Sequence, residues 1–134
     1  MSEALIRRYY AAFNSGDSEA MLACLAADVV HEVNQGGTRH GIEAFREFLR
    51  HMARCYEEEV LDLVVMTAAS GERAAVEFIV KGRYIATDEG LPEARGQTYE
   101  LRAGTFLAIR DGLIGRVTTC YNLQDWIAQV RGGG

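Results

Sequence analysis

Residues 98–122 read TYELRAGTFLAIRDGLIGRVTTCYN and contain two runs of alternating side-chain character on either side of Asp111-Gly112. A two-residue type I′ turn needs a positive φ at both central positions, and Asp-Gly satisfies this need at low cost. The stretch therefore predicts two strands, near 98–110 and 113–122, that pair antiparallel.

Two more alternating runs precede this hairpin, near 59–69 and 73–87. Ser70-Gly71 separates them, and a longer loop over 88–97 leads into the hairpin. Together the four runs predict the main strands of one antiparallel sheet.

The first part of the chain has helical periodicity instead. Apolar side chains at helical spacing predict helices near 3–14, 18–27 and 42–56, and the β-branched stretch 29–34 predicts an edge strand or the arm of a hairpin. Residues from Asn122 onward predict a short terminal helix. Helices gathered before strands indicate the α+β class, because a parallel α/β sheet needs alternating units.

We therefore expect a single α+β domain over residues 1–131 and a flexible tail over 132–134. Its three N-terminal helices should pack on the concave face of a cone-shaped, curved antiparallel sheet. A strongly curved sheet that is covered on one side encloses space, so this arrangement predicts an apolar pocket.

The composition, with 49% hydrophobic and 25% charged residues, is that of an ordinary globular domain. The net charge of −5 and the scattered Lys and Arg residues argue against nucleic acid as a partner. No apolar run reaches the roughly 20 residues that cross a bilayer, and the N-terminus lacks a signal-peptide pattern. We therefore expect a cytoplasmic protein without membrane contact.

The cysteines Cys24, Cys55 and Cys120 lie far apart and have no metal-type spacing. No H-E-x-x-H, serine nucleophile elbow or Gly-rich phosphate loop occurs in the sequence. We therefore expect reduced cysteines, no metal site and no cofactor.

Four stretches carry a family resemblance: RYYAAFNSGD at 8–17, LAADVVH at 25–31, GIEAF at 41–45 and DGLI at 111–114. They resemble the SnoaL-like and ketosteroid isomerase-related members of the nuclear transport factor two-like superfamily, whose fold is a cystatin-like roll. The resemblance covers nearly the whole chain. It implies a small apolar ligand in the cone and a homodimer formed through the outer face of the sheet.

Ketosteroid isomerases place a carboxylate base on the first strand and use a tyrosine with a protonated aspartic acid as an oxyanion hole. By resemblance, Tyr9 takes the place of that tyrosine. The base position falls near Val33 and the acidic donor position near Thr105, and neither residue is a carboxylate. The resemblance therefore implies this chemistry only if the base has moved to Glu32 or been replaced by His31.

His31 and Glu32 are neighbours in a predicted strand, so only one of them readily enters the cone. In such a strand the side chain of His31 points to the same face as those of Val29 and Val33. If that face looks inward, His31 is the candidate general base or acid, because imidazole titrates near neutral pH. In the opposite register Glu32 takes the role. The structural alternatives are a hydrogen-bonded core histidine, a solvated glutamate and, for Tyr9, simple packing of the first helix.

Further candidates lie on the later strands. The tyrosines Tyr84, Tyr99 and Tyr121 either line the cavity or pack there, as aromatic residues do in strands. Asn122 either binds a carbonyl group or caps the terminal helix. The candidate catalytic residues are thus His31, Glu32 and Tyr9, and the candidate ligand-binding residues are Val33, Tyr84, Tyr99, Thr105, Tyr121 and Asn122.

Two functional hypotheses follow. The first is a cofactor-free isomerase- or cyclase-like enzyme that removes a proton from a small apolar carbonyl compound, steroid-like or polyketide-like. The second is a non-catalytic module of the same fold that binds a small ligand or forms a dimer, and the missing carboxylates favour it.

Overall fold

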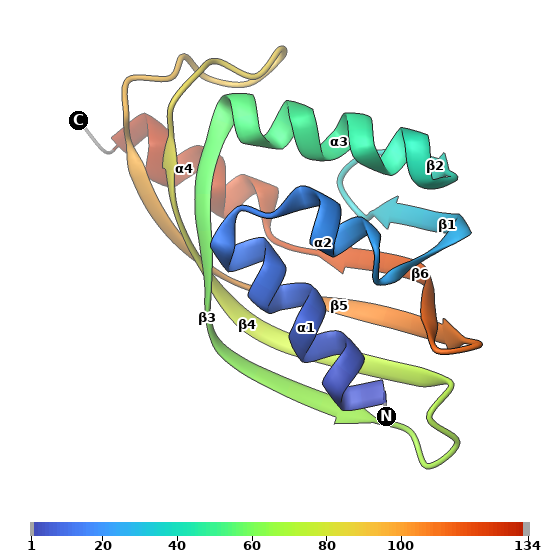
Figure 1. Ribbon diagram of the computed structural model, residues 1–134. Helices are drawn as coiled ribbons and strands as arrows, with labels where there is room; N and C mark the ends of the chain where they lie inside the picture. Colours follow the sequence, from blue (N-terminus) through green and yellow to red (C-terminus); the bar gives the residue numbers. More distant parts are fainter. Residues whose placement is uncertain (1, 133–134) are drawn as a thin grey trace.

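Figure 1 shows the computed structural model, which describes residues 2–132. Its elements are α1 (Ser2–Ser15), α2 (Ser18–Leu22), β1 (Leu25–Val33), β2 (Thr38–His40), α3 (Ile42–Cys55), β3 (Tyr56–Thr67), β4 (Arg73–Tyr84), β5 (Thr98–Arg110), β6 (Leu113–Cys120) and α4 (Leu123–Gly132). The first three helices lie across the concave side of a strongly curved sheet (Figure 1). The predicted α+β architecture is thereby confirmed.

Within the described residues, six strands form one sheet in the order β2-β1-β6-β5-β4-β3. The hairpin from β5 to β6 turns at Asp111 and Gly112, whose φ values are 54° and 74°. These positive angles are what the Asp-Gly dipeptide predicts. The antiparallel pairing of β5 with β6 is confirmed.

Strand β1 differs from the expectation in two respects. It runs parallel to β6, whereas its pairing with β2 is antiparallel. It also begins at Leu25, which pairs with Ile114 of β6 although it lies in the range predicted as the second helix. Helix α2 ends at Leu22, so the predicted helix over 18–27 is wrong in its second half. Pairing with a distant strand outweighs the local helical spacing there.

The curvature of the sheet has a visible cause in β3. A bulge shifts the pairing register between Leu61 and Val64, and Asp62 inside it has a φ of 54°. Bulges bend and twist the strand that contains them. The bend carries β3 around the helices and opens the concave side toward them.

The edge of the sheet at β3 is partly covered by α1. The side-chain amide of Asn14 donates to the Val60 carbonyl at 2.9 Å, and the Val60 N–H donates to Asn14 Oδ1 at 2.8 Å. Because β3 is the last strand of the sheet, these backbone groups have no further strand to pair with. Asn14 therefore substitutes for a neighbouring strand at one position.

Two apolar clusters hold the helices on the sheet. The larger one joins α1, α2 and α3 to the inward side chains of the strands. The smaller one packs Trp126 and Val130 of α4 against Tyr84, Tyr99 and Leu101. Gly132 ends α4, and the other two residues of the predicted tail, 133–134, lie outside the described residues.

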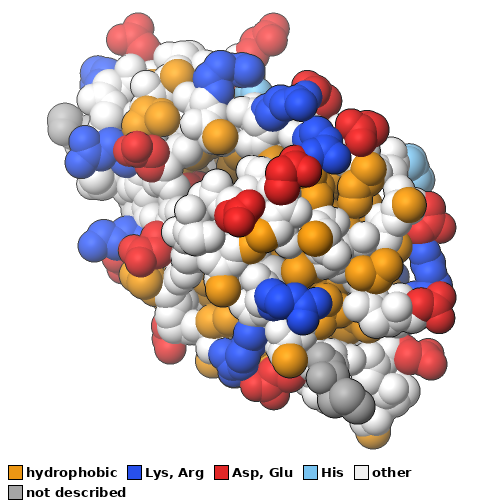
Figure 2. Space-filling view, viewed as in Figure 1, with side chains coloured by type: hydrophobic (Ala, Val, Ile, Leu, Met, Phe, Trp, Pro, Cys, Tyr) orange, Lys and Arg blue, Asp and Glu red, His pale blue; other side chains and the backbone are white. Residues whose placement is uncertain are grey.

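Figure 2 shows the same side of the molecule, with red and blue side chains over the region where α3 runs. On α3 itself, Arg46 forms an ion pair with Glu43, and Arg50 forms one with Glu47. None of the helices in the described range combines the length and apolar character that crossing a lipid bilayer requires.

Candidate functional site

A cavity of about 400 Å³ lies between the helices and the concave face of the sheet. This volume falls within the usual range for small-molecule pockets. Its wall is mainly apolar and aromatic, with Phe45, Phe48 and Leu49 from α3 and Phe78, Leu101 and Val117 from the strands. An apolar ligand body therefore fits the wall, and the few polar groups in it should decide how a ligand is oriented.

His31 is the most deeply buried of these polar groups, with 3% of its surface exposed. Its ring lies between those of Phe45 and Phe48, with centroids 4.5 Å from each. Its Nδ1 is buried and has no hydrogen-bond partner within the described chain. Burial, together with the nearby Arg39 guanidinium, lowers the pKa of His31 to about 4, so the imidazole is neutral at pH 7.

Glu32 points to the other face of the sheet. Its Oε1 accepts a hydrogen bond from the hydroxyl of Thr118 on β6 at 2.6 Å, and the residue does not line the cavity. This corrects the alternative in which Glu32 enters the cone, because the register places His31 and Val33 on the cavity side instead.

Two tyrosines of α1 reach the cavity wall. Tyr9 packs edge-on against Tyr10, and the Tyr10 hydroxyl lies 2.6 Å from Thr105 Oγ1. The Tyr9 hydroxyl has no hydrogen-bond partner among residues 2–132. Burial raises the pKa of both phenols, so both remain protonated at neutral pH and can donate hydrogen bonds. Thr105 was a sequence candidate, whereas its partner Tyr10 was not.

The later tyrosines separate into two kinds. Tyr121 lines the cavity, but Tyr84 and Tyr99 do not. Tyr84 donates to the Pro92 carbonyl at 2.7 Å, and Tyr99 donates to Glu58 Oε2 at 2.6 Å. Of the two alternatives for Tyr84 and Tyr99, packing describes their position, because their end of the sheet is filled by α4.

Asn122 also lies outside the cavity wall. Its Oδ1 accepts a hydrogen bond from the backbone N–H of Asp125 at 3.0 Å. That contact satisfies a free N–H at the start of α4. The capping alternative for Asn122 therefore describes the structure, and the carbonyl-binding alternative does not.

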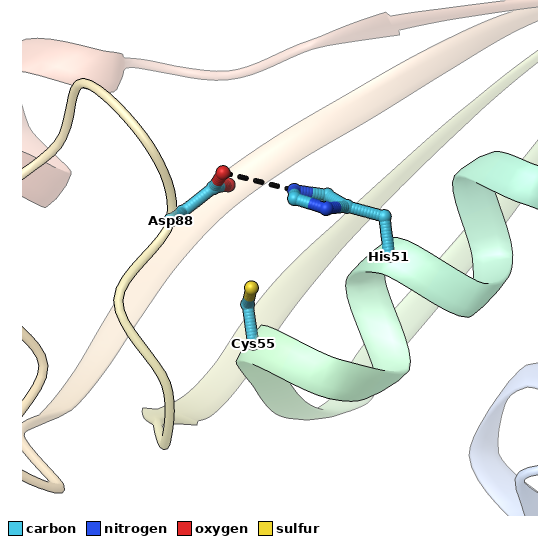
Figure 3. Close-up of side chains that lie close together, drawn as sticks. All are labelled: His51, Cys55 and Asp88. Carbon is cyan, nitrogen blue, oxygen red and sulfur yellow. Dashed lines mark hydrogen bonds and ion pairs between the residues drawn. The ribbon is translucent and has the colours of Figure 1, made fainter.

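A second polar group on the wall was missed by the sequence analysis. His51 and Cys55 project from the end of α3 toward Asp88 on the facing loop (Figure 3). Arg54 Nη2 lies 3.0 Å from His51 Nδ1. Because guanidinium only donates, Nδ1 accepts and the proton of the neutral ring is on Nε2, which donates to Asp88 Oδ1 at 2.9 Å. Both ring nitrogens of His51 are thus hydrogen-bonded at the cavity wall.

His51, Cys55 and Asp88 are also the residues in the described range that come nearest to a metal ligand set, with ligand atoms within 4.8 Å of one another. The hydrogen bonds argue for another use. Nε2 of His51 carries a proton toward Asp88, and the Tyr56 hydroxyl donates to Asp88 Oδ2 at 2.7 Å. A metal ion would have to displace the His51 bond and shift the tautomer that Arg54 favours.

Glu58 is a further cavity residue that the sequence analysis did not select. It is half-buried, it lines the wall, and desolvation raises the pKa of its carboxyl group. The signal was present in the sequence, because Tyr56, Glu58 and Val60 alternate and all three line the cavity.

Comparisons with known proteins agree with this geometry. A model of the SnoaL-like domain family matches residues 6–117. None of the curated proteins matches the chain.

Two solved structures are similar over nearly the whole chain. A candidate polyketide cyclase from Pseudomonas putida is 53% identical, with a TM-score of 0.96 over 97% of this chain and 98% of that one. Another, from a Silicibacter species, is 56% identical, with a TM-score of 0.94 over 96% and 94%.

A third similarity concerns the fold alone. An NTF2-like protein of unknown function from Burkholderia pseudomallei is 21% identical, with a TM-score of 0.79 over 96% of both chains. Since the family model spans most of its length, the chain belongs to the SnoaL-like domain family and has the NTF2-like fold.

Proposed function

We propose that the protein is a cofactor-free isomerase- or cyclase-like enzyme that acts on a small apolar carbonyl compound, steroid-like or polyketide-like, by proton abstraction. The observation that carries the proposal is the buried, unpartnered imidazole of His31 in the wall of an apolar cavity. Buried polar groups are nearly always hydrogen-bonded, so an exception beside a cavity points to a ligand as the missing partner. The similarity to candidate polyketide cyclases supports the reaction class.

In the proposed reaction an unprotonated ring nitrogen of His31 takes a proton from the carbon next to the carbonyl group. The electron pair of that C–H bond moves toward the carbonyl, and the negative charge develops on its oxygen. Tyr9, whose hydroxyl has no partner within the described chain, donates a hydrogen bond to this oxygen. If the enolate is conjugated with a C=C bond, return of the proton from His31 to its far carbon gives an isomer. If the enolate carbon instead attacks a second carbonyl group, a ring closes and the proton on His31 passes to the new alkoxide oxygen.

Hydrogen–deuterium exchange tests this reaction without knowledge of the natural substrate. A panel of apolar ketones such as 2-tetralone is incubated with the protein in D₂O, and deuterium uptake next to the carbonyl is followed by mass spectrometry. We expect His31→Gln to lower the enzyme-dependent rate by roughly 10²–10⁴-fold. The matched control is His40→Gln, because His40 is exposed on β2. No exchange above buffer with any ketone would reject the proposal.

One observation favours the non-catalytic alternative. Val33 and Thr105 both line the cavity, and neither supplies the carboxyl group found at these positions in ketosteroid isomerases by resemblance. If the cavity only binds, replacing His31 and Tyr9 together should leave ligand affinity nearly unchanged. Retained binding with lost exchange would favour the enzyme instead.

We further propose that the protein forms a homodimer through the outer face of the sheet. Met66, Ala75 and Phe106 are cross-strand neighbours on β3, β4 and β5. Phe106 is 54% exposed and Met66 48% exposed, although both are large and apolar. A second copy covering this row would remove apolar surface from water.

A further inference from the structure

Arg39 has an unusual position for an arginine in this protein. It lies directly opposite His31 in the pairing of β1 with β2, so both side chains are on the same face of the sheet. Among the described residues it is the only arginine or lysine that lines the cavity. Its guanidinium lies 4.8 Å from the centre of the Phe48 ring.

Arg39 also differs from its neighbours in lacking an acidic partner. On α3, Arg46 pairs with Glu19 and Glu43, and Arg50 pairs with Glu47. Arg39 makes no side-chain hydrogen bond or ion pair with any residue in the range 2–132, and it is half-buried. A half-buried guanidinium on an aromatic ring therefore faces the cavity with its donors available.

The C-terminal end of α3 has the opposite character. Asp88 faces the C-terminal end of the helix (Figure 3) and lines the cavity, as does Glu58 near the start of the following strand β3. Phe48, which contacts both His31 and Arg39, precedes His51 by about one helical turn. The polar groups of the cavity are thus divided along α3, with the guanidinium over Phe48 in the middle of the helix and the carboxyl groups near its C-terminal end.

From this division we infer that the cavity binds an organic anion whose ionised oxygen, a carboxylate or an acidic enolate, pairs with Arg39 beside His31 while its apolar ring body lies along α3. Charge repulsion from Asp88 opposes the reverse orientation. A planar guanidinium binds a two-oxygen anion through paired N–H donors, which favours such groups over a neutral ketone. The inference rests on the cavity of the proposed function but not on turnover.

Calorimetric titration with two matched probes tests this inference. 2-Naphthoate carries the anionic group, and 2-acetylnaphthalene carries a neutral carbonyl on the same ring system. We expect the wild-type protein to bind naphthoate about tenfold or more tightly than the ketone, as a charge-assisted hydrogen bond in a partly buried site allows. Arg39→Gln should remove this preference, and Arg39→Lys should keep part of it because the charge remains but the fork is lost.

The control variant is Arg50→Gln, which removes an exposed arginine of α3 that does not line the cavity and should leave the preference unchanged. Equal affinity of the wild type for both probes, an unchanged preference in Arg39→Gln, or no binding of either probe would overturn the inference. The outcome is separable from that of the exchange experiment. If the protein prefers naphthoate through Arg39 but catalyses no deuterium exchange, only the proposed enzyme function is rejected. If it catalyses exchange but does not prefer naphthoate, only the inference that the cavity binds an anion is rejected.

Discussion

The hydroxyl of Tyr10 on α1 lies 2.6 Å from the hydroxyl of Thr105 on β5, across 95 positions of sequence. Both side chains are buried, at 5% and 4% exposure, so neither hydroxyl has ready access to bulk water. One of them donates and the other accepts, and the bond joins the first helix to the middle of the sheet beside the cavity.

Breaking this bond from either side should destabilise the fold. Thr105→Val keeps the shape of the side chain but leaves the Tyr10 hydroxyl without its partner, so the free energy of unfolding should fall by about 1–3 kcal/mol. Tyr10→Phe should have a similar effect. The double variant should cost clearly less than the sum, because no orphan hydroxyl remains. Urea unfolding of the four proteins measures the coupling, and strictly additive losses would contradict a shared hydrogen bond.

His31 should make stability depend on pH. Its pKa is lowered from 6.5 to about 4 in the folded protein, so the unfolded chain binds a proton at higher pH than the folded one. The contribution of neutral His31 to the free energy of unfolding is fully present above pH 6.5. It is lost as the pH falls toward 4, and the total loss is roughly 3 kcal/mol. The free energy of unfolding of His31→Gln should therefore depend less on pH than that of the wild type between pH 4 and 6.5. Parallel curves for wild type and variant would show that His31 titrates normally.

Asn14 should contribute more to stability than its exposed position suggests. Asn14→Ala removes both hydrogen bonds to Val60 on the edge strand, which we expect to cost about 1–2 kcal/mol because water replaces only part of them. Asn14→Asp keeps an acceptor for the Val60 N–H but loses the donor, so it should lie between wild type and Asn14→Ala. The unfolding midpoints of the three proteins measure this order of stability. A midpoint of Asn14→Ala equal to that of the wild type would argue against the contact between Asn14 and the edge strand.

The proposed dimer makes a prediction about mass. Phe106→Glu places a charge in the exposed apolar row and should convert a dimer into a monomer, because a buried, unpaired carboxylate opposes association. Light scattering at micromolar concentration measures the mass. Ile85→Glu is the control, since Ile85 is also exposed and apolar but lies beyond the end of β4. A monomeric wild type would reject the dimer.

Local patterns predicted most of the elements. The Asp111-Gly112 turn and the alternating strands needed only neighbouring residues to specify them. The start of β1 was missed because Leu25 is held by Ile114, a partner that local periodicity cannot reveal.

The candidate site was predictable to a smaller extent. Alternation identified His31, once the inward face was known, and it also contained the signal for Glu58. It left open whether Tyr99 lines the cavity or packs, because local patterns cannot show that α4 fills that end of the sheet. The pairing of His51 with Asp88 joins a helix to a loop 37 residues away, so it depends on the tertiary structure.

The parallel pairing of β1 with β6 affects the order in which the chain can fold. Glu32 and its partner Thr118 are 86 residues apart, so one edge of β1 can pair only after β6 is available. Contacts of such separation form slowly, because a long loop must close first. As the chain leaves the ribosome, β1 should therefore keep one open edge until β6, over residues 113–120, has been made. A chain that stops before β6 would retain this open edge of β1, and its expected fate is aggregation or degradation rather than a smaller folded domain.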